Sequence, residues 1–261
     1  MSTLNFIRRG SGKPLLLVHG LGGTWRSWNT ILEPLAAQRD VIAIDLPGFG
    51  ATPPQPGPAT FLRLADAVER FLAEHEMTGI DVVGSSMGGR LVLELARRNV
   101  VGAGVALDPG GFWRGWEETA FEQSIGLSIK LIRALRPVLP LLTGNSITRT
   151  ALFAQFSARP WALPPRIALD ELRSFAASPT FDAVLHDLID GPRQSGAPAG
   201  SLRAPLVIGW GRADRVCFPM QAKRAIAAFP DARLHWFEDS GHFPHWDSPA
   251  ETVRLILQTT V

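Results

Sequence analysis

The chain has 261 residues, of which 46% are hydrophobic and 19% are charged, a balance that can bury a continuous core and excludes disorder throughout. Lys and Arg number 26 against 24 Asp and Glu, and the basic residues are scattered, so the composition predicts no nucleic-acid partner. The single cysteine, Cys217, cannot form an internal disulfide, and no Cys/His cluster has zinc spacing, so the sequence predicts no metal site.

Short β-rich runs that end in or near glycine or aspartate recur along the chain, and helical stretches separate most of them. They are 14–18, 41–45, 80–84, 101–107, 206–209 and 234–237. Continuous apolar runs such as 15–18 and 206–208 suit strands that are buried on both faces. These runs predict an α/β fold with a mostly parallel central sheet covered by helices on both faces.

Helical periodicity is clearest in two segments, 61–73 and 87–98, both of which should pack on the sheet. A third helix is expected at 250–258. The apolar run at 15–18 is too short for a signal-peptide core, and charged residues interrupt 127–142. The sequence therefore predicts a cytoplasmic protein without stable membrane insertion.

The alternation of strands and helices fails between Trp113 and about Gly200. Helical patterns and prolines fill this stretch, and the apolar residues Leu127, Leu131, Leu135, Val138 and Leu142 share one helical face. Further helices are expected at 146–157, 166–177 and 180–190. We therefore predict a core formed by residues 1–112 and 203–261, and a helical cap insertion at 113–202.

A Gly-x-Ser-x-Gly pattern places Ser86 where a reactive serine is expected. The residues before it, 80–83, form a predicted strand, and those after it, 88–93, open a predicted helix. This strand-to-helix setting is that of a nucleophile elbow, in which the serine lies on a sharp turn. Ser85 has the wrong position in the pattern and is interpreted as a neighbour.

A serine hydroxyl needs a base within hydrogen-bond reach. His242 is the predicted base, because its loop follows the last expected strand and precedes the C-terminal helix, at the same sheet edge as Ser86. His245 is the nearest rival. His75, His186 and His235 fall in other elements, where solvated or packing roles are expected.

Asp214 is the predicted carboxylate that orients the histidine, because its loop follows an apolar strand and gives the chain order Ser, Asp, His. Asp108 follows the preceding strand and competes for this role. Asp45 is expected to shape a turn, and Asp247 to cap or pair near the C-terminal helix.

The loop after the first apolar strand is expected to stabilise an oxyanion through its backbone. The predicted donors are the N–H groups of Leu21 and Met87, with Gly22 as an alternative to Leu21. His19 is expected to brace this loop. Eight aromatic residues are candidates to line a pocket, and most of them are expected to fill the core instead: Trp25, Trp28, Phe112, Trp113, Trp116, Phe153, Phe156 and Trp161.

Taken together, the His19-Gly20 loop, the Asp45 to Gly50 run and the Ser86, Asp214 and His242 loops resemble the α/β-hydrolase superfamily. The resemblance covers essentially the whole chain except the insertion. It implies a sheet core, a helical cap over an apolar pocket, and serine-based acyl chemistry without a cofactor. Ser86 stands where haloalkane dehalogenases and epoxide hydrolases have aspartate, which argues against those activities.

The expected function is hydrolysis of a carboxylic ester of an apolar small molecule through an acyl-enzyme on Ser86. The alternative is hydrolysis of a carbon–carbon bond in a vinylogous diketone from ring cleavage, although Ser85 replaces the asparagine common in those enzymes. A lyase or perhydrolase that uses the same three residues also stays open. The expected partner is a small apolar substrate.

Overall fold

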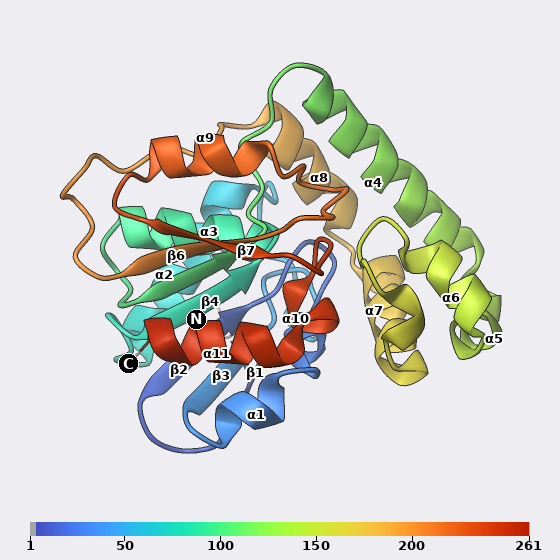
Figure 1. The fold of residues 1–261 in the computed structure, drawn as a ribbon, viewed down its shortest axis with the longest axis horizontal. Coiled ribbons are helices and arrows are strands. Elements are labelled where there is room, and N and C mark those ends of the chain that lie inside the picture. The colour runs from blue at the N-terminus through green and yellow to red at the C-terminus, as the bar shows by residue number, and fades with distance from the viewer. Residues whose placement is uncertain (1–3, 261) are drawn as a thin grey trace.

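A computed structural model of the protein describes residues 4–260, which contain a seven-stranded sheet (Figure 1). The strands are β1 (Phe6–Arg9), β2 (Pro14–Val18), β3 (Asp40–Ile44), β4 (Asp81–Ser85), β5 (Gly104–Leu107), β6 (Leu206–Gly211) and β7 (Arg233–Phe237). Their spatial order is β1-β3-β2-β4-β5-β6-β7, and only β1 runs antiparallel to its neighbour among these strands. The predicted fold class is therefore confirmed.

The six parallel strands are those that the apolar runs predicted, with ends shifted by up to three residues. β3, β4, β5 and β6 are buried along their whole length, which explains their continuous apolar sequences. The sequence did not reveal β1. This edge strand is mostly exposed and reads Phe-Ile-Arg-Arg, so it has no buried apolar run to detect.

Helices cover both faces of the sheet (Figure 1). One face packs against α2 (Phe61–Glu74), α3 (Met87–Arg97) and α9 (Gln221–Ala228). The other packs against the 3-10 turn η1 (Trp25–Trp28), α1 (Leu32–Ala36) and α11 (Pro249–Thr259), whose buried side chains include Trp28, Leu35 and Ile256. Because β2 to β7 run parallel, their carboxyl ends all lie at one edge of the sheet, between these two layers of helices.

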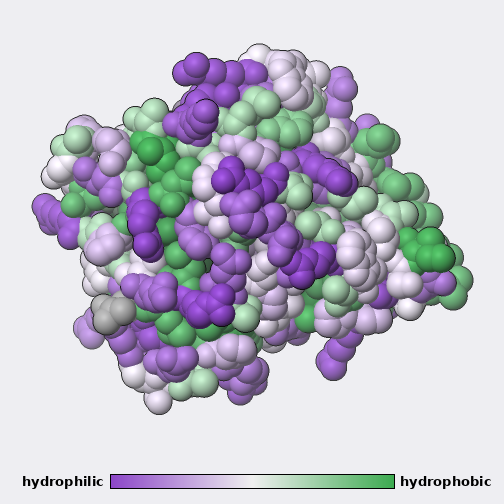
Figure 2. Space-filling model, viewed as in Figure 1, coloured by the Kyte–Doolittle hydropathy of each residue, from purple (hydrophilic) through white to green (hydrophobic). Residues whose placement is uncertain are grey.

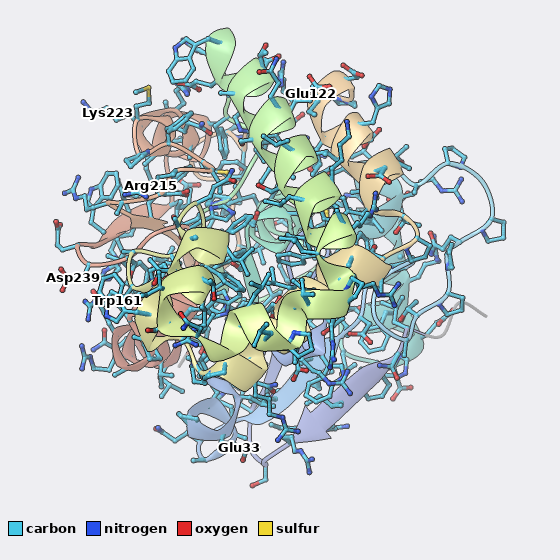
Figure 3. The ribbon with its side chains drawn as sticks, turned by 90° about the vertical axis from the view of Figure 1, so that its right-hand side faces the viewer. Glu33, Glu122, Trp161, Arg215, Lys223 and Asp239 are labelled. Atoms are coloured by element: carbon cyan, nitrogen blue, oxygen red, sulfur yellow. The ribbon has the colours of Figure 1, made fainter. Side chains whose placement is uncertain are left out.

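Every described element between β5 and β6 is helical. These elements are α4 (Trp116–Ala134), η2 (Arg136–Val138), α5 (Leu139–Gly144), α6 (Ser146–Phe153), η3 (Pro160–Ala162), α7 (Pro165–Ala177) and α8 (Phe181–Asp190). In Figure 1 they extend beyond one end of the sheet, and Figure 3 looks onto α4, α5 and α6 from that side. That residues 113–202 form a separate cap domain stays a prediction.

Helix α4 packs inward through a face other than the predicted one. Leu127 and Leu131 are 70% and 51% exposed, whereas Ile125, Ile129 and Ile132 are buried. The helix also ends at Ala134, so the single apolar face expected to continue to Leu142 is broken. Apolar residues occur on both faces of α4, and the sequence pattern alone did not identify which face is covered.

The surface of the insertion is apolar in places. Figure 2 shows hydrophobic residues at the edge formed by α5 and α6, where Leu141 and Ile147 are exposed. Within residues 4–260, no helix combines the length and the apolar composition needed to cross a bilayer.

Candidate active site

Ser86 lies on a strained turn between β4 and α3. Its φ of 57° and ψ of −117° are unusual for a residue with a side chain and cost on the order of 1–3 kcal/mol. The glycines on either side permit the turn, because a Cβ on Gly84 would lie 2.1 Å from the carbonyl oxygen of Gly88. A Cβ on Gly88 would lie equally close to the carbonyl oxygen of Val18. The Gly-x-Ser-x-Gly sequence thus allows the serine to project at the end of the strand.

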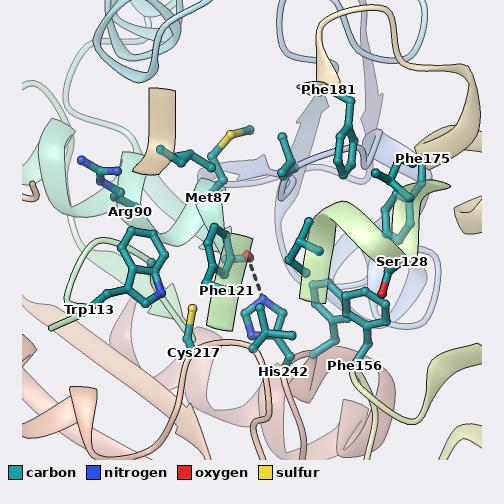
Figure 4. A pocket seen from close by; sticks show the side chains of 18 of the residues that line it. Met87, Arg90, Trp113, Phe121, Ser128, Phe156, Phe175, Phe181, Cys217 and His242 are labelled. Carbon is teal, nitrogen blue, oxygen red and sulfur yellow. Dashed lines mark hydrogen bonds between the residues drawn. The ribbon is translucent and has the colours of Figure 1, made fainter. Parts of the chain in front are cut away.

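His242 lies between Ser86 and Asp214 and is hydrogen-bonded to both. Its Nε2 is 2.8 Å from the Oγ of Ser86, a contact drawn as a dashed line in Figure 4. Its Nδ1 is 2.9 Å from the Oδ2 of Asp214. With Nδ1 donating to the carboxylate, Nε2 can accept the serine proton. The structure therefore brings together the three residues that the sequence singled out.

The backbone of its own loop holds Asp214 in place. Its Oδ1 accepts hydrogen bonds from the N–H groups of Val216 at 2.7 Å and Cys217 at 3.0 Å. These bonds leave Oδ2 for the histidine. The carboxylate is 3% exposed, so it acts on the imidazole in an environment largely without water.

Asp108, the rival acid, does not reach the histidine. Its Oδ1 accepts a hydrogen bond from the N–H of Gly211 at 2.8 Å, and the residue is fully buried. Burial, and then the negative charge of Asp214, raise the pKa of Asp108 well above its ordinary value. Because its surroundings disfavour the charged form, Asp108 is poorly suited to stabilise an imidazolium, whereas Asp214 is hydrogen-bonded to the histidine.

The rival histidines occupy other environments. His245 is buried against the Trp28 ring, and burial followed by the nearby His242 lowers its pKa to about 3. His19 Nδ1 lies 2.7 Å from the carbonyl oxygen of Gly20, and its Nε2 accepts a hydrogen bond from the N–H of Leu46 at 3.0 Å. His19 therefore braces the loop, as expected.

The loop that holds Leu21 lies against the serine. A Cβ on Gly20 would lie 3.1 Å from the Cβ of Ser86, so the backbone of this loop directly contacts the turn. Leu21 and Met87 both line the pocket at Ser86, whereas Gly22 is not among the lining residues. Ser174 of α7 donates a hydrogen bond to the carbonyl oxygen of Gly22 at 2.7 Å, so the insertion helps to fix the loop.

The pocket beside Ser86 and His242 has an empty volume of about 630 Å³ and an almost wholly apolar lining. The lining residues are Leu21, Ser86, Met87, Arg90, Gly110, Trp113, Phe121, Ile125, Ser128, Ile129, Ile132, Phe156, Phe175, Phe181, Leu188, Val216, Cys217, His242 and Phe243. Figure 4 shows the guanidinium of Arg90 pointing away from His242. It lies over the Phe61 ring, 3.9 Å from the centroid.

Only two of the eight aromatic candidates line this pocket, Trp113 and Phe156. Trp25, Phe112, Trp116, Phe153 and Trp161 do not line it, and Trp28 lines a smaller cavity nearby. Trp116 and Trp161 are more than half exposed, and Phe153 packs against Trp246. The sequence missed Phe121, Phe175 and Phe181, because the directions of side chains in the insertion depend on how its helices pack. It also missed Phe243, which lies next to His242 in the histidine loop.

Asp247 joins the histidine loop to the insertion and does not cap the C-terminal helix. Its carboxylate accepts hydrogen bonds from the N–H groups of Gly241 and Ala158, both at 2.8 Å, and from the Ser157 hydroxyl. His242 N–H also donates to the carbonyl oxygen of Phe156 at 2.9 Å. Asp247 therefore pairs near the C-terminal helix, as one of its two expected roles has it, and its partners are Gly241, Ala158 and Ser157.

One group of side chains has the composition of a metal site. Potential ligand atoms of Asp214, Cys217 and His242 lie within 4.8 Å of one another. Burial, and then the charge of Asp214, raise the pKa of Cys217 well above its ordinary value, which opposes the thiolate that a metal requires. Both nitrogens of His242 are also already hydrogen-bonded, so these residues fit proton transfer better than metal binding.

Comparisons with known proteins agree with this geometry. The family model "Alpha/beta hydrolase family" matches residues 15–255. The dihydrolipoyllysine-residue acetyltransferase component of the acetoin cleaving system of Cupriavidus necator is 30% identical over 97% of the chain, which spans 65% of that relative. A 2-hydroxy-6-oxononadienedioate/2-hydroxy-6-oxononatrienedioate hydrolase of Cupriavidus pinatubonensis is 26% identical over 95% of the chain and 87% of the relative. A thermophilic esterase from Thermogutta terrifontis has a TM-score of 0.76 at 21% identity, with 98% of this chain and 92% of that one covered.

Proposed function

Since the chain belongs to the alpha/beta hydrolase family, we propose that it is a serine hydrolase that cleaves a carboxylic ester of an apolar small molecule. The single observation that carries the proposal is the Ser86–His242–Asp214 chain of hydrogen bonds, which opens on an apolar pocket of about 630 Å³. An apolar pocket with a few polar groups at one end suits a small organic substrate.

In the proposed reaction, Ser86 Oγ bonds to the ester carbonyl carbon while its proton passes to His242 Nε2. The carbonyl oxygen becomes an oxyanion, which the N–H groups of Leu21 and Met87 stabilise. When the carbon–oxygen bond to the alcohol breaks, the imidazolium gives its proton to the leaving alkoxide. Water, activated by the same histidine, then releases the acid and restores Ser86.

Hydrolysis of a carbon–carbon bond is the second candidate, and the relative from Cupriavidus pinatubonensis supports it. The name of that enzyme's substrate, a dioate, describes two carboxylates. Arg90 is the one lysine or arginine in the pocket lining of the described residues, and its guanidinium stacks on Phe61. It also donates a hydrogen bond to the carbonyl oxygen of Pro192. Its Nε and Nη1 have no hydrogen-bond partner, but the guanidinium points away from His242 (Figure 4). No cation therefore faces the reacting serine and histidine, which favours a neutral ester.

A direct comparison of substrates tests the proposal. Short-chain aryl esters and a vinylogous diketone would be incubated with the protein, and the products identified by mass spectrometry. Acid and alcohol from the esters, with an acyl adduct on Ser86 after rapid quenching, are the expected results. Cleavage of the diketone with no ester turnover would overturn the ester assignment in favour of the second candidate.

A further inference from the structure

A second, smaller cavity lies directly behind the loop that carries Leu21. It has an empty volume of about 260 Å³ and shares Leu21, Phe175 and Phe243 with the apolar pocket. Gly20 also lines it, and this glycine contacts Ser86. We call this cavity the annex. The apolar pocket that holds Ser86 and this smaller cavity therefore adjoin at the three shared side chains.

The annex concentrates buried polar groups that the proposed reaction does not use. Its lining includes Ser27 and Trp28 of η1, Ser85 of β4, Glu171 of α7 and His245 of the helix α10 (Pro244–Asp247). All five are at least nine-tenths buried. They come from the sheet core and from the insertion, so the annex exists only where these two parts meet.

Several of these groups have no hydrogen-bond partner. The Trp28 Nε1, the Ser85 Oγ and the His245 Nδ1 are all buried and unpaired. Leaving buried donors and acceptors unpaired costs about 1–3 kcal/mol each in typical proteins. Three such atoms around one cavity point to a polar group that enters it.

The charges in the annex restrict what that group can be. Burial raises the pKa of Glu171 to about 8, so its carboxyl is mostly neutral at pH 7. His245 is neutral as well, because its pKa is lowered to about 3. No lysine or arginine lines the annex within residues 4–260. The cavity therefore offers neutral donors and acceptors, and no counter-charge for an anion.

We propose that the annex binds the short second arm of the substrate, and that Glu171 and Ser85 select a neutral hydroxyl or amide over a carboxylate. This inference rests on the proposed function, since it takes Ser86 as the point from which two substrate arms diverge. The apolar arm occupies the pocket of about 630 Å³, and the polar arm enters the annex beside Leu21, Phe175 and Phe243, which line both cavities. Glu171 then determines specificity through a direct hydrogen bond.

Two ester series test this assignment. The first comprises hexyl esters of propanoic acid, 3-hydroxypropanoic acid and succinic acid. The second comprises hexanoate esters of propanol, 1,3-propanediol and 3-hydroxypropanoic acid. Within each series the apolar arm is constant and the short arm ends in a methyl, a hydroxyl or a carboxylate group. Turnover is measured with the wild-type protein, and binding with Ser86→Ala protein by calorimetry, which does not depend on hydrolysis.

In at least one series, the hydroxyl ester should bind roughly tenfold more tightly than the methyl ester, and the carboxylate ester more weakly than either. Adding Glu171→Leu should bring the hydroxyl-to-methyl ratio close to one, and Ser85→Ala should lower it. Glu171→Gln should keep most of the preference because an amide still donates and accepts. Glu122→Gln, on the exposed side of α4, is the matched control and should leave the ratio unchanged.

Equal binding of hydroxyl and methyl esters in both series would overturn the annex assignment and reduce the cavity to a site for water. A hydroxyl preference that survives Glu171→Leu and Ser85→Ala would overturn it too. If the wild-type protein hydrolyses no ester while the binding preference follows Glu171, the proposed function fails and the annex assignment stands. Ester hydrolysis without any such preference would support the proposed function and overturn the annex assignment.

Discussion

The imidazole of His242 is held 2.9 Å from Asp214, although a second buried carboxyl, that of Asp108, belongs to the neighbouring loop. Asp108 instead accepts a hydrogen bond from Gly211, the last residue of β6. The two acids therefore have separate partners. One faces the histidine, and the other fixes the end of the strand that leads to the Asp214 loop.

This separation predicts unequal effects of two matched amide substitutions. Asp214→Asn should lower turnover of an aryl ester by roughly 10³ to 10⁴-fold, because an amide cannot stabilise the imidazolium. Asp108→Asn should cost far less turnover, since the Asp108 carboxyl is hydrogen-bonded to Gly211 while His242 Nδ1 is hydrogen-bonded to Asp214. Steady-state kinetics with circular dichroism as a check on folding would compare them. The reverse ranking would assign the acid to Asp108, and similarly large losses would mean that both carboxyls serve the histidine.

The geometry of the turn predicts which serine reacts. Ser86→Ala should abolish covalent labelling by an organophosphonate and lower turnover by about 10⁴-fold or more, because the hydrogen-bonded residues act as a unit. Ser85→Ala should still be labelled, since His242 Nε2 is hydrogen-bonded to Ser86 and the Ser85 hydroxyl has no hydrogen-bond partner. Intact-mass spectrometry gives the readout. Full labelling of Ser86→Ala protein would exclude Ser86 as the nucleophile.

Pocket lining predicts which aromatic residues govern substrate choice. Phe121→Ala and Trp113→Ala should change the ratio of rates for long and short acyl esters, because both side chains line the cavity. Phe153→Ala is the matched control: Phe153 is fully buried outside the lining, so it should lower stability and leave the ratio unchanged. Rate ratios measured beside thermal unfolding separate these effects. A shifted ratio in Phe153→Ala alone would contradict this division.

The raised pKa of Glu171 predicts a dependence of stability on pH. Folded protein keeps this carboxyl protonated up to about pH 8, whereas the unfolded chain releases the proton near its ordinary pKa. The stability contribution is therefore fully present below the unfolded pKa and is lost as pH rises toward 8. The loss is at most about 1.4 kcal/mol per pH unit for one group.

Urea unfolding at pH 5, 6, 7 and 8 would measure this effect, with Glu171→Gln as the comparison. The stability of the wild-type protein should fall relative to Glu171→Gln as pH rises over this interval, because the amide does not titrate. Other titrating groups, including Asp108, act in both proteins and cancel in the difference. A constant difference across the four pH values would show that Glu171 ionises normally in the folded protein.

Asp247 predicts a coupling between the insertion and the histidine loop. The Asp247 carboxylate accepts on both oxygens, from Gly241 and Ala158 at Oδ2 and from Ser157 at Oδ1, whereas in Asp247→Asn only one atom accepts. We expect a stability loss of about 1–3 kcal/mol and lower turnover, since buried hydrogen bonds to a charged group are strong. Denaturant unfolding and ester kinetics give both values. Unchanged turnover would mean that His242 is held without this link.

The sequence by itself determined the sheet and the order of its parallel strands along the chain, because strands buried on both faces leave continuous apolar runs. It also singled out Ser86, His242 and Asp214, since in a parallel sheet the loops after the strands gather at one edge, whatever the details of packing. The Gly84 and Gly88 positions mark the turn, because only glycine fits where a Cβ would strike backbone.

Only the tertiary structure decided what surrounds those three residues. Phe121 lies in α4, which has apolar residues on more than one face, and Phe175 and Phe181 reach the pocket only because α7 and α8 pack beside it. In the sequence, Glu171 is an ordinary charged residue of a predicted helix. In the structure it is buried, because α7 packs against η1. Periodicity records which residues share a face of one element. Contacts between distant segments set burial, pKa and pocket shape, and these leave no local pattern in the sequence.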